Sequence, residues 1–216
     1  MKGCALPALL LALLSSGAMA SDWEADVSFN LGLTAGLEDD VAYDATIYDG
    51  ETEEYMGHSK VRAGGLYYTG FGLQLANVDW GVLANAAYHF TGTSSNTVDD
   101  ERALFRRFAY DLLPYYRIDR AFRVGAGVTY HASPKTTVSL TEGKVHDKYD
   151  DALGLTVFAG YQLPESRSWV ELRYTDIDYE AETSGANDLD GAHFGLILHW
   201  IPDMSSASEM YREAMH

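Results

Sequence analysis

A histidine and a serine two positions apart, His131 and Ser133, come closest in this sequence to a catalytic pair. A serine nucleophile needs a base within hydrogen-bond reach. In an extended strand, residues i and i+2 share a face and lie about 6–7 Å apart, which is near enough for an adjusted pair. Glu142 is a candidate third member of such a set. The set would support acyl-ester hydrolysis, provided that the strand presents both side chains to the substrate.

Charged residues inside apolar, alternating segments carry a second kind of chemistry. They are Glu24, Asp26, Lys60, Arg62, Arg107, Asp111, Arg117, Arg123, Glu171 and Arg173. Charges far from bulk water persist only when they are paired and hydrogen-bonded, and the guanidinium fork of arginine matches a carboxylate. We expect an ion-pair network that fills a narrow interior, which four histidines could join: His89, His131, His193 and His199. The alternative is a small pore or gate whose pairs exchange. No His, Cys or Asp spacing is specific for a metal, so we expect neither a metal ion nor a cofactor.

The elements that must position these residues are long β-strands. In RVGAGVTYH, Val124, Ala126, Val128 and Tyr130 point one way and the small or polar residues between them point the other, as period-two alternation requires. The same pattern predicts eight strands: Asp22–Leu37, His58–Leu75, Trp80–Phe90, Leu104–Ile118, Phe122–Ser133, Ala152–Leu163, Trp169–Glu180 and Ala192–Trp200. Strands of ~9–11 residues suit a bilayer, whereas soluble sheets average ~5–6. The connections alternate long and short, as in bacterial outer-membrane barrels.

Two features place the apolar face outward, toward lipid, rather than inward as in a soluble lipocalin-type barrel. The polar face is rich in glycine, as expected where an eight-stranded lumen has room for few side chains. The apolar face carries aromatic residues toward both strand ends, which is the double girdle of a membrane barrel. These aromatics are Trp23, Phe71, Trp80, Tyr116, Phe122, Tyr161 and Trp200 near the short turns, and Tyr88, Phe90, Tyr110 and Tyr130 near the long loops. The predicted fold is all-β, an eight-stranded antiparallel up-and-down transmembrane β-barrel.

The ends of the sequence indicate export. Lys2, the apolar run Ala5–Leu14 and the small residues at Ala18 and Ala20 predict a cleaved signal peptide over residues 1–20. The barrel is then expected over residues 21–201, followed by a short polar periplasmic tail over 202–216. The only cysteine, Cys4, lies in the signal segment, so no disulfide is expected. A net charge of −17 disfavours nucleic-acid binding.

The export signal, the eight alternating strands, the tight turn IDRAF, the RVGAGVTYH strand and the final HFGLILHW strand resemble the small outer-membrane β-barrel family. That family includes OmpA-type transmembrane domains and OmpX, and the resemblance covers about Asp22–Trp200. It implies a bacterial outer-membrane location, the barrel-assembly machinery as a partner, and contact with outer-membrane lipids and lipopolysaccharide. The outer-membrane lipid A deacylase also resembles this chain in fold and uses a His-x-Ser pair with a Glu. Alternation, however, puts His131 and Ser133 on the lumen face, whereas such an enzyme must meet its lipid from outside.

These observations predict a structural or surface-interaction role without catalysis. The segment Glu38–Gly57 contains eight Asp or Glu and no Lys or Arg. We expect a solvated loop there, with an extracellular partner or divalent cations bridging to lipopolysaccharide phosphates as alternatives. The alternative functions are a lipid A-modifying enzyme built on His131 and Ser133, and a small channel or a barrel that binds an apolar ligand.

Overall fold

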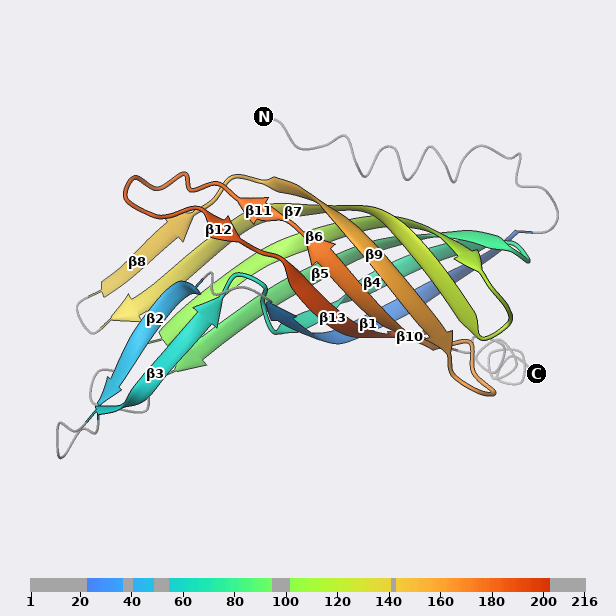
Figure 1. Cartoon of the computed structure of the whole chain (residues 1–216), viewed down its shortest axis with the longest axis horizontal. Helices are drawn as coiled ribbons and strands as arrows, with labels where there is room; N and C mark the ends of the chain where they lie inside the picture. The colour runs from blue at the N-terminus through green and yellow to red at the C-terminus, as the bar shows by residue number, and fades with distance from the viewer. Residues whose placement is uncertain (1–22, 37–40, 49–54, 95–101, 141–142, 203–216) are drawn as a thin grey trace, which may run out of the picture.

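The chain is built from β-strands (Figure 1), and this computed structural model describes residues 23–36, 41–48, 55–94, 102–140 and 143–202. The strands are β1 (Glu24–Gly36), β2 (Val41–Tyr48), β3 (Tyr55–Arg62), β4 (Tyr67–Ala76), β5 (Trp80–Ser94), β6 (Arg102–Arg117), β7 (Phe122–Leu140), β8 (Gly143–Lys148), β9 (Ala152–Gln162), β10 (Trp169–Asp176), β11 (Asp178–Tyr179), β12 (Leu189–Asp190) and β13 (His193–Trp200). Within these ranges, no helix is long and apolar enough to cross a membrane.

Eight of the strands close into one antiparallel barrel. Their order around the wall is β1-β4-β5-β6-β7-β9-β10-β13, and β13 pairs with β1 to complete the ring. In that closing pair Phe29 lies opposite Trp200. The predicted fold class is therefore confirmed.

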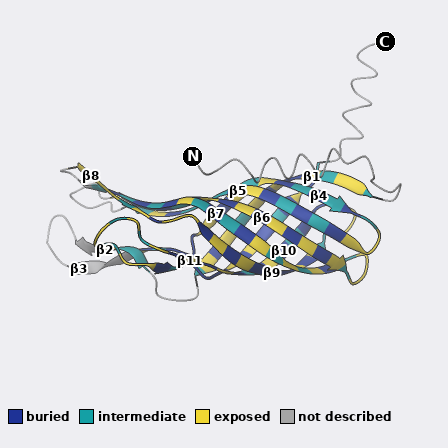
Figure 2. Ribbon diagram, turned by 90° about the horizontal axis from the view of Figure 1, so that it is seen from above, coloured by how far each residue is buried: buried dark blue, intermediate teal, exposed yellow. Residues whose placement is uncertain are grey.

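The barrel turns its apolar side chains outward. On β9, Leu153 is 71% exposed and Leu155 is 63% exposed, whereas Gly154 between them and Thr156 and Phe158 beyond them are buried. Figure 2 shows the same alternation of exposed and buried residues along the other wall strands. Exposed aromatics lie near both ends of this band, and those near the short turns include Trp80, Phe122, Tyr161 and Trp200. Because so much exposed apolar surface is stable only against lipid, the chain is an outer-membrane β-barrel, as its resemblance to the small barrel family implied.

The tight turns form where the sequence predicted them. The Asn77 side-chain oxygen accepts hydrogen bonds from the backbone N–H groups of Asp79 and Trp80, at 3.0 and 2.7 Å. Asp119 does the same for Ala121 and Phe122, at 2.7 Å each. Asn and Asp favour such turns because their side chains replace a backbone acceptor. This end of the barrel, with its short turns, is the periplasmic end.

The predicted strand over His58–Leu75 is wrong as one element. β3 ends at Arg62 and pairs with β2 outside the barrel wall, while β4 begins at Tyr67. Between them Gly65 adopts a φ of +75°, a left-handed conformation that glycine tolerates and that ends the extended strand. The alternation rule cannot detect this break, because the residues on both sides keep the same alternating pattern.

Two predicted loops contain strands. The acidic loop predicted over Glu38–Gly57 contains β2 and the start of β3. The loop predicted over Pro134–Asp151 contains the end of β7 and all of β8. β7 continues past Pro134 because it contains a β-bulge at Ser133, which has a φ of 52°. On one side of the bulge Phe108 lies opposite Ala132, and on the other side Arg106 lies opposite Lys135. The extra residue lets pairing resume beyond the proline.

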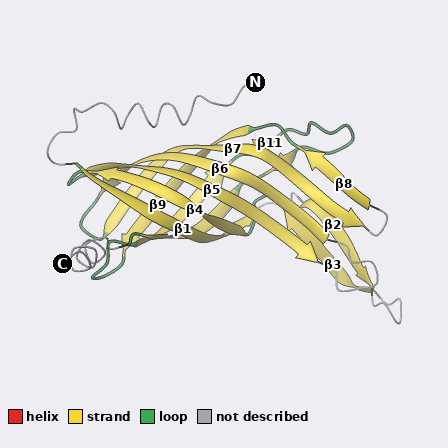
Figure 3. Cartoon of the chain, turned by 180° about the vertical axis from the view of Figure 1, so that it is seen from behind, coloured by secondary structure: helices red, strands yellow, loops and turns green. Residues whose placement is uncertain are grey.

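The strands beyond the membrane pack on a second hydrophobic core. We call β2, β3, β8, β11 and β12, with the loop-side ends of β5, β6 and β7, the outer platform. Figures 1 and 3 show β2, β3 and β8 projecting past the same end of the barrel. The buried apolar residues of this core are Val61, Ala63, Ala103, Phe105, Val138, Tyr149, Ala152, Ile177, Tyr179 and Leu189. The outer platform is therefore a folded part of the protein with its own packed interior.

Candidate functional site

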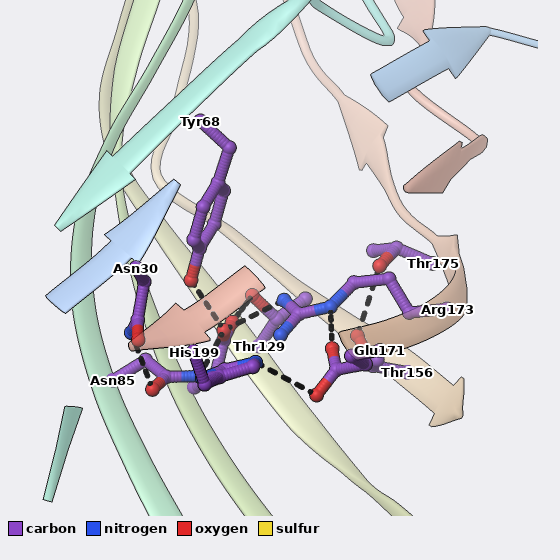
Figure 4. Close-up of polar contacts among 10 residues, drawn as sticks. Asn30, Tyr68, Asn85, Thr129, Thr156, Glu171, Arg173, Thr175 and His199 are labelled. Atoms are coloured by element: carbon purple, nitrogen blue, oxygen red, sulfur yellow. Dashed lines mark hydrogen bonds and ion pairs between the residues drawn. The ribbon is translucent and has the colours of Figure 1, made fainter. Parts of the chain in front are cut away.

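A buried ion-pair network occupies the middle of the lumen (Figure 4). Arg173 on β10 places Nη1 2.8 Å from Asp111 Oδ2 on β6, and its Nε donates to Glu171 Oε1. His199 Nε2 lies 3.2 Å from Glu171 Oε2. All four side chains are at most 3% exposed. One guanidinium thus bridges two carboxylates that come from different parts of the wall.

Neutral polar groups complete the coordination of Asp111. Tyr68 donates to its Oδ2 at 2.9 Å, Asn85 donates to the same oxygen at 3.1 Å, and Thr129 donates to Oδ1 at 2.7 Å. Asn30 continues the chain by donating to Asn85 at 2.9 Å. A buried carboxylate is stable when its lone pairs are satisfied in this way.

A second layer of the lumen lies toward the periplasmic turns and centres on Arg123. Its two Nη atoms donate to Gln74 and Gln162, at 2.9 and 3.0 Å. Its guanidinium lies 4.0 Å above the Trp169 ring, and Trp169 stacks on His199 with ring centroids 4.0 Å apart. Stacked cation and aromatic planes leave little room for water at this level.

A third layer lies at the outer mouth, where Arg107 contacts His131 and two further histidines lie beside that pair. Arg107 Nε donates to His131 Nδ1 at 3.1 Å, and the Tyr179 hydroxyl lies 2.6 Å from the same nitrogen. Because arginine can only donate, Nδ1 is the acceptor nitrogen of His131 and Tyr179 also donates to it. The rings of His89 and His193 lie 5.0 Å apart beside them. Burial raises the pKa of Tyr179, which belongs to the outer platform, to about 12 and so keeps its phenol neutral.

The structure brings together three of the ten predicted network residues and distributes the others. Asp111, Glu171 and Arg173 form the central network, while Arg107 and Arg123 lie above and below it with neutral partners. Glu24 and Asp26 pair with Arg167 at the periplasmic mouth, Arg117 is half-buried at the end of β6, and Lys60 and Arg62 lie on β3 outside the barrel wall.

Sequence reasoning missed the neutral members of the network. Tyr68, Asn85 and Thr129 each donate one hydrogen bond to Asp111. Their signal was present, because they occupy lumen-facing positions in the alternation. A neutral side chain at such a position does not by itself indicate a member of an ion-pair network.

The histidine and serine of the predicted pair face different surroundings. His131 is buried and bonded to Arg107 and Tyr179, whereas Ser133 is exposed at the β-bulge. The backbone N–H of Ser133 donates to Asp151 Oδ1 at 2.8 Å. The prediction that Ser133 faces the lumen is therefore wrong, because the bulge turns it out of phase. Glu142 lies outside the described residues.

Metal ligation finds no support in the part of the chain that the structure describes, because no group of three or more His, Cys, Asp or Glu there is arranged to hold an ion. A groove of about 570 Å³ at the outer rim is strongly acidic nevertheless. It is lined by Asp150, Asp151, Asp178, Glu180 and Glu182, with Ala152 and Leu153.

The chain was also compared with known proteins, and no family model and no curated protein matches it. Among solved structures it is similar to Ail, the attachment invasion locus protein of Yersinia pestis, in complex with the heparin analogue sucrose octasulfate. The identity is 14%, over 82% of this chain and 96% of that one, with a TM-score of 0.49. A second Ail structure is 12% identical over 83% of this chain and 97% of that one, with a TM-score of 0.46. Neisserial surface protein A is 7% identical over 82% of this chain and 95% of that one, with a TM-score of 0.44. The architecture rests on the strand pairing itself.

Proposed function

We propose that this chain is a non-conducting, non-catalytic outer-membrane barrel that holds its outer platform at the cell surface for contact with an extracellular partner. The observation that carries the proposal is the second hydrophobic core. Loops that merely connect strands have no need of ten buried apolar residues drawn from many elements. A rigid scaffold that fixes a surface is what binding segments commonly require.

The filled lumen supports the non-conducting part of this role. Three layers of side chains, centred on Arg107, Arg173 and Arg123, lie one above another in a barrel that is just wide enough for its own side chains. A continuous water path would need these groups to leave partners inside a low-dielectric interior. Removing one member of such a pair typically costs about 3–5 kcal/mol, so the filled state is favoured.

The exposed position of Ser133 supports the non-catalytic part. A nucleophile without its base lacks the hydrogen bond that would activate it. His131 already accepts bonds from Arg107 and Tyr179, so its Nδ1 has no capacity for a serine.

The charge of the rim groove on the outer platform indicates the chemistry of the partner. The rim groove carries five carboxylates, and the segment Glu38–Gly57 is acidic throughout its sequence. Complementary potentials steer and select partners, so a basic partner is favoured. Purified barrel in nanodiscs of zwitterionic lipid should bind a fluorescent oligolysine peptide, measured by fluorescence anisotropy.

A variant with Asp178→Asn, Glu180→Gln and Glu182→Gln should bind the peptide less tightly. Three acids at the opposite mouth, Glu24, Asp26 and Glu165, changed to their amides, provide the control with equal charge loss. Equal weakening by both variants would contradict a partner surface on the outer platform. The heat-modifiable gel shift of each variant verifies that its barrel is folded.

A further inference from the structure

A row of basic side chains crosses the outer wall just above the membrane band. The strand register places Arg106 of β6 opposite Lys135 of β7, and Lys135 opposite Lys148 of β8. Residues paired across antiparallel strands project from the same face. Two outward-facing rows farther from the membrane, Arg102 lies opposite Ser139, and Ser139 lies opposite Lys144. The outer face of these three strands therefore carries five cations in a chain whose net charge is −17.

No carboxylate of the described residues forms an ion pair with these cations, which are Arg102, Arg106, Lys135, Lys144 and Lys148. The one acid on β8, Asp147, lies opposite Thr136 and so projects from the other face. An unpaired basic row on an acidic protein is suited to an anionic ligand.

The row lies at the height of lipid headgroups. Arg106 is two residues above Phe108 on β6, which is about 6–7 Å along the strand. Phe108 is 50% exposed. Tyr110 and Tyr130 face lipid one row deeper in the membrane, and the three rings belong to the loop-side aromatic girdle. Because girdle aromatics mark the edge of the hydrocarbon, the basic row meets the headgroup layer of the outer leaflet.

An apolar groove begins one row below Arg106, at the β6 end of the basic row, and extends across the wall away from Lys135 and Lys148. It has a volume of about 590 Å³ and opens on the outer wall across β1, β4, β5 and β6. Thr69, Gly70 and Ala86 form its small-residue floor, and Phe71, Tyr88 and Phe108 line its sides. The rings of Tyr88 and Phe108 lie 5.4 Å apart at the end nearest Arg106. A groove in the hydrocarbon band that leads up to Arg106, at the end of the basic row, matches an acyl chain below an anionic headgroup.

We propose that Arg106, Lys135 and Lys148, with the groove that begins below Arg106, form a binding site for a phosphorylated, multiply acylated glycolipid of the outer leaflet, the chemistry of lipid A. The cations bind the phosphate groups and the groove takes an acyl chain. The site rests on the outer-membrane placement of the proposed function. It uses side chains other than those of the acidic rim groove, which adjoins it where the Glu182 N–H donates to the Lys148 carbonyl at 2.9 Å.

Native mass spectrometry and titration of the barrel in zwitterionic nanodiscs test the site, with bisphosphorylated lipid A and its dephosphorylated form as probes. We expect the bisphosphorylated form to bind and the dephosphorylated form to bind at least tenfold less tightly. The variant Arg106→Ala/Lys135→Ala should weaken binding roughly thirtyfold, because each of the two basic residues near an anionic surface contributes on the order of 1 kcal/mol. The control Lys60→Ala/Arg120→Ala removes the same charge elsewhere and should leave affinity unchanged.

The variant Ala86→Phe tests the groove, since its ring would fill the floor without changing any charge. We expect it to weaken binding of lipid A and to leave binding of inorganic pyrophosphate unchanged. Equal affinity for both lipid forms, or equal weakening by the control, would overturn phosphate recognition by this row. Unchanged lipid A affinity in Ala86→Phe would overturn the assignment of the acyl chain to the groove. Oligolysine binding by the same variants reports separately on the proposed function.

Discussion

Arg173 on β10 and Asp111 on β6 lie 2.8 Å apart across the lumen, although two other strands separate them around the wall. Both side chains are almost fully buried, at 3% and 1% exposure. The pair therefore connects opposite parts of the wall inside the barrel. Each charge neutralises the other, so removing one partner would leave an uncompensated buried charge and destabilise the folded barrel.

Removing one partner of this pair should destabilise the barrel strongly. Arg173→Met leaves Asp111 and Glu171 without their shared cation, and we expect a loss of about 3–5 kcal/mol in the free energy of unfolding. Urea titration of the folded barrel in lipid vesicles, followed by tryptophan fluorescence, measures it. The double variant Asp111→Asn/Arg173→Met should lose less than the sum of the two single variants. Strict additivity would contradict a direct coupling.

The lipid-facing band should be intolerant of charge. Val128→Arg places a cation near the middle of the outward face of β7, and we expect a loss of about 2–4 kcal/mol. Ser184 is exposed in the connection between β11 and β12, so the control Ser184→Arg should change the free energy of unfolding little. If both arginines have the same small effect in the urea titration, this face of β7 does not meet the hydrocarbon.

Glycines of the lumen should resist enlargement where a side chain lies above them. A Cβ at Gly81 would lie 2.3 Å from the Tyr115 ring, so Gly81→Ala should destabilise by about 1–3 kcal/mol through overpacking. At Gly36 the nearest atom to an added Cβ is 3.6 Å away, and Gly36→Ala should be tolerated. Equal urea midpoints for the two variants would mean that the lumen is not packed as described.

The outer platform should lose stability in strong alkali. Burial raises the pKa of Tyr179 from 10.0 to about 12, so its neutral form is favoured in the folded state. This contribution is complete below pH 10 and is lost as the pH rises from 10 toward 12. Tyr179→Phe should reduce the alkaline loss, which protease susceptibility of the platform measures at each pH. An identical pH profile for the variant would contradict the assignment of this titration to Tyr179.

Hydrolysis should be absent. Because Ser133 is exposed and His131 is committed to Arg107 and Tyr179, Ser133→Ala should leave the lipid A acylation pattern of an expressing bacterium unchanged. Mass spectrometry of extracted lipid A provides the measurement. If lipid A loses an acyl chain only when both Ser133 and His131 are present, the enzyme hypothesis would be restored.

Alternation alone predicted the wall strands and their two faces, because a period of two is a local property of an extended chain. It also placed Asp111, Glu171 and Arg173 inward, but only as three of ten charged residues expected in one network. It could not give their heights along the barrel axis. Arg107 and Arg123 share the inward face with Asp111, yet they lie at other levels, because height follows from register and strand tilt.

The remaining errors come from single backbone positions. Gly65, with a φ of +75°, ends the strand that carries Lys60 and Arg62, and the two cations thereby leave the lumen set. Ser133, with a φ of 52°, turns itself outward and lets β7 continue past its proline. A glycine and a serine–proline step are compatible with several conformations, so tertiary pairing decides between them.

The filled lumen is the central claim, and conductance across a planar bilayer tests it most directly. Purified barrel inserted at known density should show no steady current, because the layers around Arg107, Arg173 and Arg123 leave no continuous water path. Arg123→Ala should lower the free energy of unfolding before any channel appears. A stable, ion-selective current from the unmodified protein would contradict the account.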